Sequence, residues 1–275
     1  LEDELSICFD THRPKSFIFD GAFPYRGMLR AIHSRDDIDK LWMRRGTFRK
    51  GSSIPVDSIG FFDAVIHPED SVKIDTNSLK HSVEVITCPP ILILDEDEKL
   101  SKESARRRLG IPMDCIAVYV QLGAGEINDI HSEIRLTISS LTNQNGIHVI
   151  LGESLIGERL DIDLDNVHII RDYPNAMYFN GFDATVQAGG YNSFHETRQS
   201  SLPALFYPNM NTGMDDQEAR CNIAVTEGWG IVIVERNDNT ISEGVSQLLE
   251  KTRSKQTEFE RSGAWNLAEK ILARG

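Results

Sequence analysis

Asn192, Ser193 and Glu196 could act together on one polar ligand, because residues three and four positions apart lie on the same face of a helix. Asn192 and Ser193 offer neutral hydrogen-bond donors that suit phosphate oxygens, whereas Glu196 offers an acceptor. The two hydroxyls of a ribose would suit that acceptor, as they suit the acidic residue of a Rossmann site. The same spacing also fits a capping box, in which Ser193 is the N-cap residue and the Glu196 side chain accepts a hydrogen bond from the backbone N–H of Ser193. The two roles are compatible.

A glycine pair, Gly189-Gly190, stands directly before these residues and follows the apolar run 184–187. A strand that passes through glycines into a helix brings the free N–H groups of the helix's first turn to the carboxyl edge of the sheet. Those donors and the helix dipole form an anion site. The alternative is a helix that needs the two glycines only to turn tightly.

A second glycine turn, Gly123-Ala124-Gly125, follows the apolar run 115–122 and precedes an expected helix over 128–141. If both turns belong to one sheet, they would face the same crevice and offer backbone donors to a diphosphate from two sides. A nicotinamide or flavin site is poorly supported, because Asn128 occupies the place of the third glycine in GxGxxG. A Walker A motif is absent as well, since no glycine loop is followed by GK[ST].

The elements that would hold these turns alternate between strands and helices, which predicts α/β architecture with parallel sheets. Strands are expected at 16–20, 61–67, 83–86, 115–122, 147–151, 167–170, 184–187, 203–207 and 230–234. Helices are expected at 25–33, from Asp36-Asp37 through Trp42, after Ser101, at 128–141 and 176–179, from 191, from 216, and at 240–252 and 256–272. We expect Arg106 to Arg108 to lie on a solvent-exposed face of a helix.

Paired prolines, Pro89-Pro90, mark the expected domain boundary, because they cannot continue the interior of a sheet. We expect two Rossmann-like domains: residues 1–88 form a partial N-terminal one, and residues 89–275 form a nucleotide-binding one. The first of these looks like the later half of such a domain. The sequence begins without methionine, which is consistent with a fragment or a processed chain.

Composition excludes several other classes of protein. The formal charge of -13 argues against a nucleic-acid binder, because such binding depends on Lys and Arg neutralising phosphates. No apolar run approaches the roughly 20 residues that a membrane-spanning helix needs. The histidines and the four cysteines lack metal-ligand spacing, so we expect no metal site, no cofactor and buried free thiols in a reducing compartment.

Residues 188–196, AGGYNSFHE, resemble the donor-binding signature of UDP-sugar glycosyltransferases of the two-Rossmann-domain (GT-B) type. That group includes plant-type enzymes with a GWNS-x-x-E core and the N-acetylglucosaminyltransferase of peptidoglycan synthesis. Gly190, Tyr191, Asn192, Ser193 and Glu196 match the core in register, with Tyr191 in place of its tryptophan. The resemblance is good over residues 90–275 and loose over 16–88.

The resemblance implies further contacts with the donor. Asp216-Gln217 is similar to the acid–glutamine pair that contacts the donor sugar, although about four extra residues precede it here. By the same likeness uracil should lie near Ile170 and Arg171, with Met177 beneath. Ala188 stands where plant-type enzymes carry a histidine against the diphosphate.

The catalytic base is not identified by the resemblance. Such enzymes usually carry the base and a first glycine loop early in the acceptor domain, and nothing before Ser16 matches. Asp20, at the end of an expected strand, and His33 are the remaining candidates.

The implied activity is metal-independent transfer of a hexosyl or N-acetylhexosaminyl group from a UDP-sugar to an acceptor hydroxyl. The acceptor could be a glycan such as one of the cell envelope, a lipid-linked molecule or a small molecule. The implied location is the cytoplasm, at the inner membrane face if the acceptor is lipid-linked. Two alternatives stay open: a nucleotide-sugar hydrolase or epimerase of the same fold, and a non-catalytic donor-binding subunit. The subunit would work with a separate partner or with a missing N-terminal segment.

Overall fold

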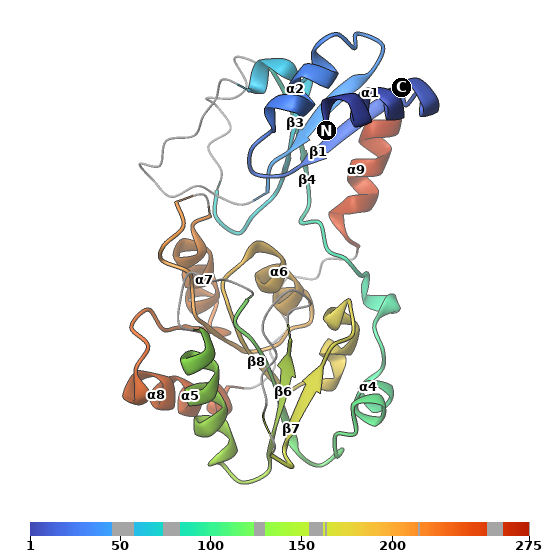
Figure 1. Cartoon of the computed structure of the whole chain (residues 1–275). Helices are drawn as coiled ribbons and strands as arrows, with labels where there is room; N and C mark the ends of the chain where they lie inside the picture. Colours follow the sequence, from blue (N-terminus) through green and yellow to red (C-terminus); the bar gives the residue numbers. More distant parts are fainter. Residues whose placement is uncertain are drawn as a thin grey trace. The chain divides into compact units, whose positions relative to one another are not determined.

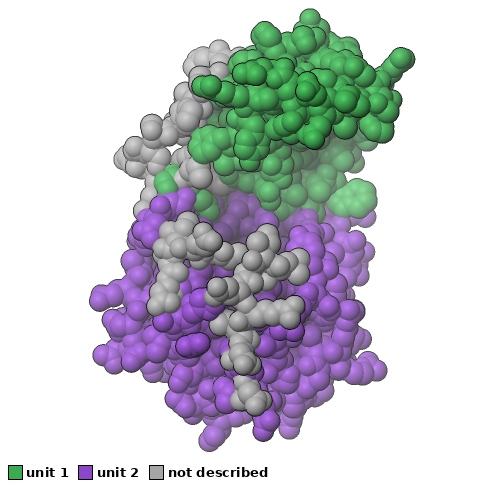
Figure 2. Space-filling view, in the orientation of Figure 1, with its two compact units in different colours: residues 1–91, 213–216, 262–275 green, residues 92–212, 217–261 purple. Residues whose placement is uncertain are grey.

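The computed structural model describes residues 1–45, 58–73, 83–123, 130–153, 162, 164–213, 215–251 and 261–274. The chain divides into two compact units (Figure 2). Unit 1 comprises residues 1–91, 213–216 and 262–275, and unit 2 comprises residues 92–212 and 217–261. Each unit is built on one parallel sheet, as the alternation of strands and helices predicts.

The sheet of unit 1 has the strand order β1-β2-β3-β4, with every neighbouring pair parallel. Its strands are β1 (Ser16–Asp20), β2 (Asp39–Met43), β3 (Ala64–Pro68) and β4 (Glu84–Cys88). The helices α1 (Glu2–His12) and α2 (Arg26–His33) and the 3₁₀ turn η1 (Ile59–Phe61) precede β1, β2 and β3 in turn. Phe9, Trp42 and Phe62 lie in the core between the sheet and these helices. The helix α1 was not expected from the sequence.

The expected helix from Asp36 through Trp42 is wrong. Asp36 and Asp37 lie in a turn, and Asp39–Met43 forms β2, which is paired on both sides. Leu41 and Trp42 are 0% and 1% exposed and belong to different core clusters. Neighbouring residues buried on opposite faces are typical of a strand inside a sheet, and this tertiary burial outweighs the local helical pattern.

The helix α9 (Gly263–Leu272) packs beside β4 in unit 1 (Figure 1). Leu267 joins the core cluster that contains Cys88, and the N–H of Gly263 donates a 2.8 Å hydrogen bond to the carbonyl oxygen of Pro90. Arg274 binds Asp39 at 2.7 Å, close behind the helix. The domain range 89–275 expected from the sequence assigned this helix to the C-terminal domain, whereas its contacts group it with unit 1.

The sheet of unit 2 has the strand order β10-β9-β8-β5-β6-β7, again with every neighbouring pair parallel. Its strands are β5 (Ile116–Gln121), β6 (Ile147–Gly152), β7 (Val167–Ile170), β8 (Ala184–Gln187), β9 (Ala204–Phe206) and β10 (Gly230–Val232). Its helices are α4 (Lys102–Leu109), α5 (Ile130–Thr142), α6 (Tyr191–Gln199), α7 (Gln217–Thr226) and α8 (Asp238–Glu250), with 3₁₀ turns η2 (Glu96–Glu98) and η3 (Asn175–Gly181).

The strand order of unit 2 reverses between β5 and β8. From β5 the chain proceeds outward through β6 to β7, and it then returns to β8 and proceeds the other way through β9 to β10. Connections diverge at such a switch point and leave a crevice at the carboxyl ends of the two central strands, where α/β proteins bind ligands. This topology predicts a ligand site at the ends of β5 and β8.

Arg106 is fully buried, so the solvated arginine face expected for residues 106–108 is wrong at this position. Its guanidinium pairs with Asp183 at 2.6 Å and donates to the carbonyl oxygens of Gly181 and Pro112, both at 2.8 Å. Arg107 is exposed, as expected. A buried cation is tolerated here because a carboxylate and several carbonyl oxygens surround it.

All four cysteines are free thiols, and the expectation that they are buried is wrong for Cys8, which is exposed. Cys88 and Cys221 are buried, and Cys115 is partly buried. In the part of the chain that the structure describes, every helix is too short or too polar to span a bilayer.

Candidate functional site

The two glycine turns follow neighbouring strands at the switch point. Gln121 at the end of β5 is the register partner of Gln187 at the end of β8, and the N–H of Ala188 donates to the carbonyl oxygen of Gln121 at 3.2 Å. The chain therefore leaves both strands side by side. Gly123 has φ +90°, a backbone conformation that favours glycine. Ala124 and Gly125 lie outside the described residues.

Gly189 is held by close packing against α7. A methyl group added at Gly189 would lie 2.4 Å from Sγ of Cys221 and 3.2 Å from the carbonyl oxygen of Gln217. The carbonyl oxygen of Gly189 accepts a 2.9 Å hydrogen bond from the buried guanidinium of Arg220. At Gly190 a methyl group would meet nothing within 4 Å. The turn is thus anchored at its first glycine and open at its second.

The helix α6 begins immediately after this turn, with Gly190 as its N-cap residue and no side-chain cap. Ser193 is therefore inside the helix, and the capping box considered for Ser193 and Glu196 does not form. Tyr191 is buried, with its ring centroid 4.5 Å from that of His195, whereas Asn192 is exposed. The first turn of α6 thus presents its N–H groups and the Asn192 side chain at the carboxyl edge of the sheet.

Glu196 lies one turn further along α6 and is partly buried. Within the described part of the chain its carboxylate makes no hydrogen bond or ion pair, and burial raises its pKa to about 7 while Lys99 opposes the shift. The Lys99 ammonium is itself buried and donates to Oγ of Ser200 at 2.7 Å and to Glu96 at 2.8 Å. Burying a carboxylate in such surroundings destabilises the folded protein unless hydrogen-bond donors reach the carboxylate oxygens. The hydroxyls of a ligand could supply them.

The three residues expected near uracil lie at or after the end of β7. Ile170 is buried and packs in the core cluster of Tyr119, with Met177 partly buried against the same cluster. Arg171 is exposed, and its Nε donates to the carboxylate of Glu153 at 2.7 Å. Of the three side chains, Arg171 is exposed, Met177 is partly exposed and Ile170 is buried.

Asp216 and Gln217, expected at the donor sugar, lie at the start of α7. Gln217 is the first residue of the helix, and its Oε1 accepts a 2.9 Å hydrogen bond from the N–H of Asn209. Its backbone borders the Gly189 turn. Asp216 precedes it directly and is grouped with unit 1.

Asp20 and His33, the candidates for a catalytic base, lie far apart within unit 1. Asp20 ends β1 and forms an ion pair with Arg45 at 2.8 Å. His33 ends α2, its ring centroid lies 5.4 Å from that of Phe61, and it lines a groove of about 580 Å³ that also includes Arg26 and other residues of α2. Because β1 and α2 run in opposite directions across the sheet, the two side chains belong to opposite edges of it.

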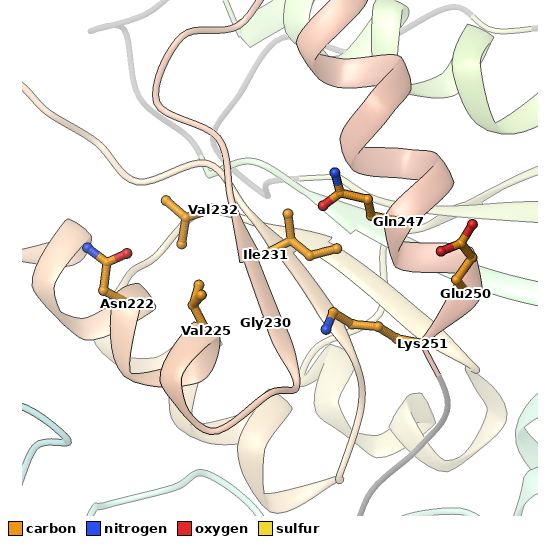
Figure 3. Close-up of a pocket in the computed structure, with 8 residues that line it drawn as sticks. All are labelled: Asn222, Val225, Gly230, Ile231, Val232, Gln247, Glu250 and Lys251. Carbon is orange, nitrogen blue, oxygen red and sulfur yellow. The ribbon is translucent and has the colours of Figure 1, made fainter.

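A second groove, of about 660 Å³, runs along the edge strand β10 between α7 and α8 (Figure 3). Its lining residues are Asn222, Val225, Gly230, Ile231, Val232, Gln247, Glu250 and Lys251. The described residues of the two glycine turns, Gly123, Gly189 and Gly190, do not line it. The described residues contain no group of three or more His, Cys, Asp or Glu side chains arranged to hold a metal ion.

Sequence reasoning missed the residues that position the site. Arg220 and Cys221 hold the glycine turn from α7, and Lys99 faces Glu196 from the segment before α4. Arg220 lies three positions after Gln217 on the same helix, which is the one local signal that could have drawn attention to it. No signal of that kind exists for Lys99.

No family model matches the sequence. Over 194 residues, covering 65% of this chain, the sequence is 26% identical to the UDP-N-acetylglucosamine–N-acetylmuramyl-(pentapeptide) pyrophosphoryl-undecaprenol N-acetylglucosamine transferase of Acetivibrio thermocellus. The chain spans about half the length of this curated relative, because the match covers 52% of it.

Among solved structures, the calicheamicin glycosyltransferase CalG4 superposes with a TM-score of 0.62 at 15% identity, over 99% of this chain and 76% of that one. The fold is GT-B. A putative UDP-N-acetylglucosamine 2-epimerase from Listeria monocytogenes superposes with a TM-score of 0.65 at 10% identity, over 99% of this chain and 77% of that one. The GT-B architecture, two Rossmann-like domains, confirms the fold class expected from the AGGYNSFHE signature.

Proposed function

We propose that this GT-B chain binds a UDP-sugar and transfers its sugar to an acceptor hydroxyl. One observation carries the proposal: Gly123 and the pair Gly189-Gly190 follow neighbouring strands at the switch point, with Glu196 one helical turn beyond the pair. This arrangement can hold a nucleoside diphosphate by its phosphates and its ribose at the same time. The similarity to an enzyme named as a UDP-N-acetylglucosamine-dependent transferase supports uridine as the base and an N-acetylhexosamine as the sugar.

Each part of the site has a role in the transfer. The N–H groups at the start of α6, together with its dipole, stabilise the charge that develops on the leaving diphosphate. The Glu196 carboxylate accepts hydrogen bonds from the ribose hydroxyls, each contributing about 1.5–3 kcal/mol. Arg171 borders the base, and Asp216 and Gln217 contact the sugar. A base on the acceptor side deprotonates the attacking hydroxyl. The acceptor is a glycan, a lipid-linked molecule or a small molecule, and a lipid-linked one would place the reaction at a membrane face.

Thermal unfolding with UDP, UDP-N-acetylglucosamine, UDP-glucose and TDP tests the donor site. A ligand at 100 times its dissociation constant should stabilise the protein by about 2.7 kcal/mol. We expect UDP to stabilise the wild type, Glu196→Gln to lose most of the effect, and the exposed control Glu243→Gln to keep it. If no uridine nucleotide stabilises a well-folded wild type, the proposal fails.

The structural similarity to an epimerase supports a second candidate on the same scaffold. Incubation of the chain with UDP-N-acetylglucosamine and no acceptor distinguishes the two activities. Isomerised nucleotide sugar would favour the epimerase, and release of free sugar would favour a hydrolase. If UDP binds but no acceptor mixture yields transfer, the chain acts as a donor-binding subunit that needs a partner for activity.

A further inference from the structure

Gln121, the last residue of β5, carries a carboxamide at the switch point of unit 2. Its register partner on β8 is Gln187. Gly123 follows Gln121 by two residues, and Gly189 follows Gln187 by two. Because side chains alternate along a strand, the Gln121 side chain lies on the same sheet face as that of Tyr119. The carboxamide is therefore positioned where both glycine turns begin.

The oxygen of this carboxamide is bound by a tyrosine. The Tyr119 hydroxyl donates a 2.9 Å hydrogen bond to Oε1 of Gln121 and accepts one of 2.9 Å from Nδ2 of Asn175. A tyrosine hydroxyl has a single proton, so this proton points to Gln121. Burial raises the pKa of the Tyr119 hydroxyl and the charge of Glu196 adds to the shift, although the hydrogen bond from Asn175 opposes it. The hydroxyl therefore keeps its proton at neutral pH.

The packing around Tyr119 fixes the position of its hydroxyl. The side chain is 0% exposed, and its ring stacks on that of Phe182, with 5.1 Å between the centroids and 2° between the planes. There is room for the hydroxyl because residue 152 is glycine: a methyl group added at Gly152 would lie 2.3 Å from the hydroxyl oxygen. A fixed hydroxyl in turn fixes the orientation of the Gln121 carboxamide.

The nitrogen of the same carboxamide has no protein partner. In the part of the chain that the structure describes, Nε2 of Gln121 makes no hydrogen bond, and this atom is not buried. The paired glutamine differs, because Nε2 of the buried Gln187 donates to Oγ1 of Thr197 at 2.7 Å. Of the two glutamines that precede the glycine turns, Gln121 therefore offers N–H groups to a ligand and Gln187 supports α6.

We propose that Gln121 is a nucleotide-binding residue whose Nε2 donates a hydrogen bond to a phosphate oxygen of the bound UDP-sugar. Tyr119 is then the positioning residue that directs Nε2 toward the ligand. Phosphate oxygens only accept hydrogen bonds, so they need donors from both strands: the N–H groups of α6 lie after β8, and Gln121 supplies its donor from β5. The ribose hydroxyls instead need the acceptor Glu196. This inference rests on the proposed function and names a further contact of the same site.

The side-chain N–H signals of Gln121 test the contact directly in the wild type by NMR. The signals are assigned by their absence from the spectrum of Gln121→Met. The probes are UDP, inorganic pyrophosphate and uridine. We expect UDP and pyrophosphate to shift the Gln121 signals, and uridine to leave them unchanged because it has no phosphate.

The outcomes separate this inference from the proposed function. If UDP stabilises the protein but does not shift the Gln121 signals, or if uridine shifts them as much as UDP does, the inference is wrong and the nucleotide site stands. If pyrophosphate shifts them but UDP does not stabilise the protein, the proposed function fails and the phosphate contact stands. If no probe shifts them, the contact does not exist.

Matched variants measure the contribution of each residue. Gln121→Glu keeps the size of the side chain but presents an oxygen to the phosphate, so the Kd for UDP should rise about ten-fold or more. The exposed control Gln144→Glu should leave it unchanged. An equal or lower Kd in Gln121→Glu would contradict the inference.

Tyr119→Phe removes the hydroxyl that orients the carboxamide, and the Kd for UDP should rise about three-fold. In the ligand-free variant the Gln121 N–H signals should also move toward those of an exposed glutamine. A merely structural role for Tyr119 would lower stability without moving these signals. Tyr25→Phe, at an exposed tyrosine, is the control and should change neither measurement. Where a variant does not fold, the titration of the wild type still decides.

Discussion

The guanidinium of Arg220 is fully buried and donates a 2.9 Å hydrogen bond to the carbonyl oxygen of Gly189. The same guanidinium carbon lies 5.7 Å from the ring centroid of Tyr191, the first residue of α6. A residue of α7 therefore fixes both the glycine turn and the start of the helix that follows it. The anion-binding end of α6 is held in place by a neighbouring helix as well as by its own sequence.

Replacing Arg220 with methionine should weaken the donor site. The variant fills similar space but leaves the Gly189 carbonyl without this donor, so we expect a loss of about 2–4 kcal/mol in unfolding free energy. UDP affinity, measured by calorimetry on the folded fraction, should fall along with it. The control is Arg198→Met. Arg198 lies near the end of α6, and its replacement breaks an ion pair with Glu227. Equal UDP affinity in wild type and Arg220→Met would contradict this role.

The two adjacent glycines should differ in how well they tolerate alanine. In Gly189→Ala the new methyl group meets Sγ of Cys221 at 2.4 Å, which should cost about 1–3 kcal/mol of stability. Gly190→Ala meets nothing within 4 Å, and we expect a change within about 1 kcal/mol. Chemical denaturation measures both. The double variant Gly189→Ala/Cys221→Ala should recover part of the loss, since the sulfur is removed; no recovery would argue against the contact.

Glu196 should make both stability and donor binding depend on pH. Its folded pKa, about 7, lies above its ordinary value of 4.5, so the native state holds the proton more tightly between these two values. Stability should therefore fall as pH rises through this range, by at most about 3 kcal/mol, and Glu196→Gln should abolish that part of the slope. UDP binding should instead strengthen from pH 6 to pH 8, because the ribose hydroxyls donate to the carboxylate form.

Lys99 should set the midpoint of that pH dependence. Its buried ammonium favours the charged form of Glu196, so Lys99→Met should raise the pKa of Glu196 further and move the midpoint of UDP binding to higher pH. Lys102→Met, which removes an ion pair with Asp183, is the matched control and should leave the midpoint unchanged. Titration calorimetry across pH 5–9 distinguishes the outcomes, and an unshifted midpoint in Lys99→Met would remove Lys99 from this role.

Arg106 and Arg107 offer a direct test of burial, because they are adjacent and chemically identical. Arg106→Met leaves Asp183 and several carbonyl oxygens without their shared donor, which should cost about 3–5 kcal/mol. Arg107→Met lies on the exposed side of α4 and should change stability by less than about 0.5 kcal/mol. Urea denaturation of both variants is sufficient. Similar losses in the two would contradict the buried network around Arg106.

The strands and turns that build the switch point could be predicted from local sequence. The runs 115–122 and 184–187 are rich in apolar residues, as buried strands are, and a glycine follows each within two residues. The spacing from Asn192 to Glu196 is likewise local. Trp42 was assigned to a helix because Asp36-Asp37 resembles a helix start, and only the neighbouring strands decide otherwise.

Long-range partners account for what the sequence could not predict. Nothing near Arg106 indicates that Asp183 will lie against it, and nothing near Glu196 indicates Lys99. His67 is a similar case. The alternating pattern of its strand identifies the sheet face on which the side chain lies, but not that its buried ring nitrogens have no hydrogen-bond partner. An amphipathic helix such as α9 specifies that it covers a sheet, but not which of two sheets it covers.

The return of α9 to unit 1 has a consequence for synthesis of the chain. Residues 262–275 complete the core beside β4, yet they leave the ribosome only after residues 92–261 have been made. Unit 2 can therefore fold during translation while the β4 side of unit 1 is still uncovered, with Ile86 and Cys88 exposed to solvent or to chaperones. We therefore expect unit 1 to complete its core only after the whole of unit 2 has been synthesised.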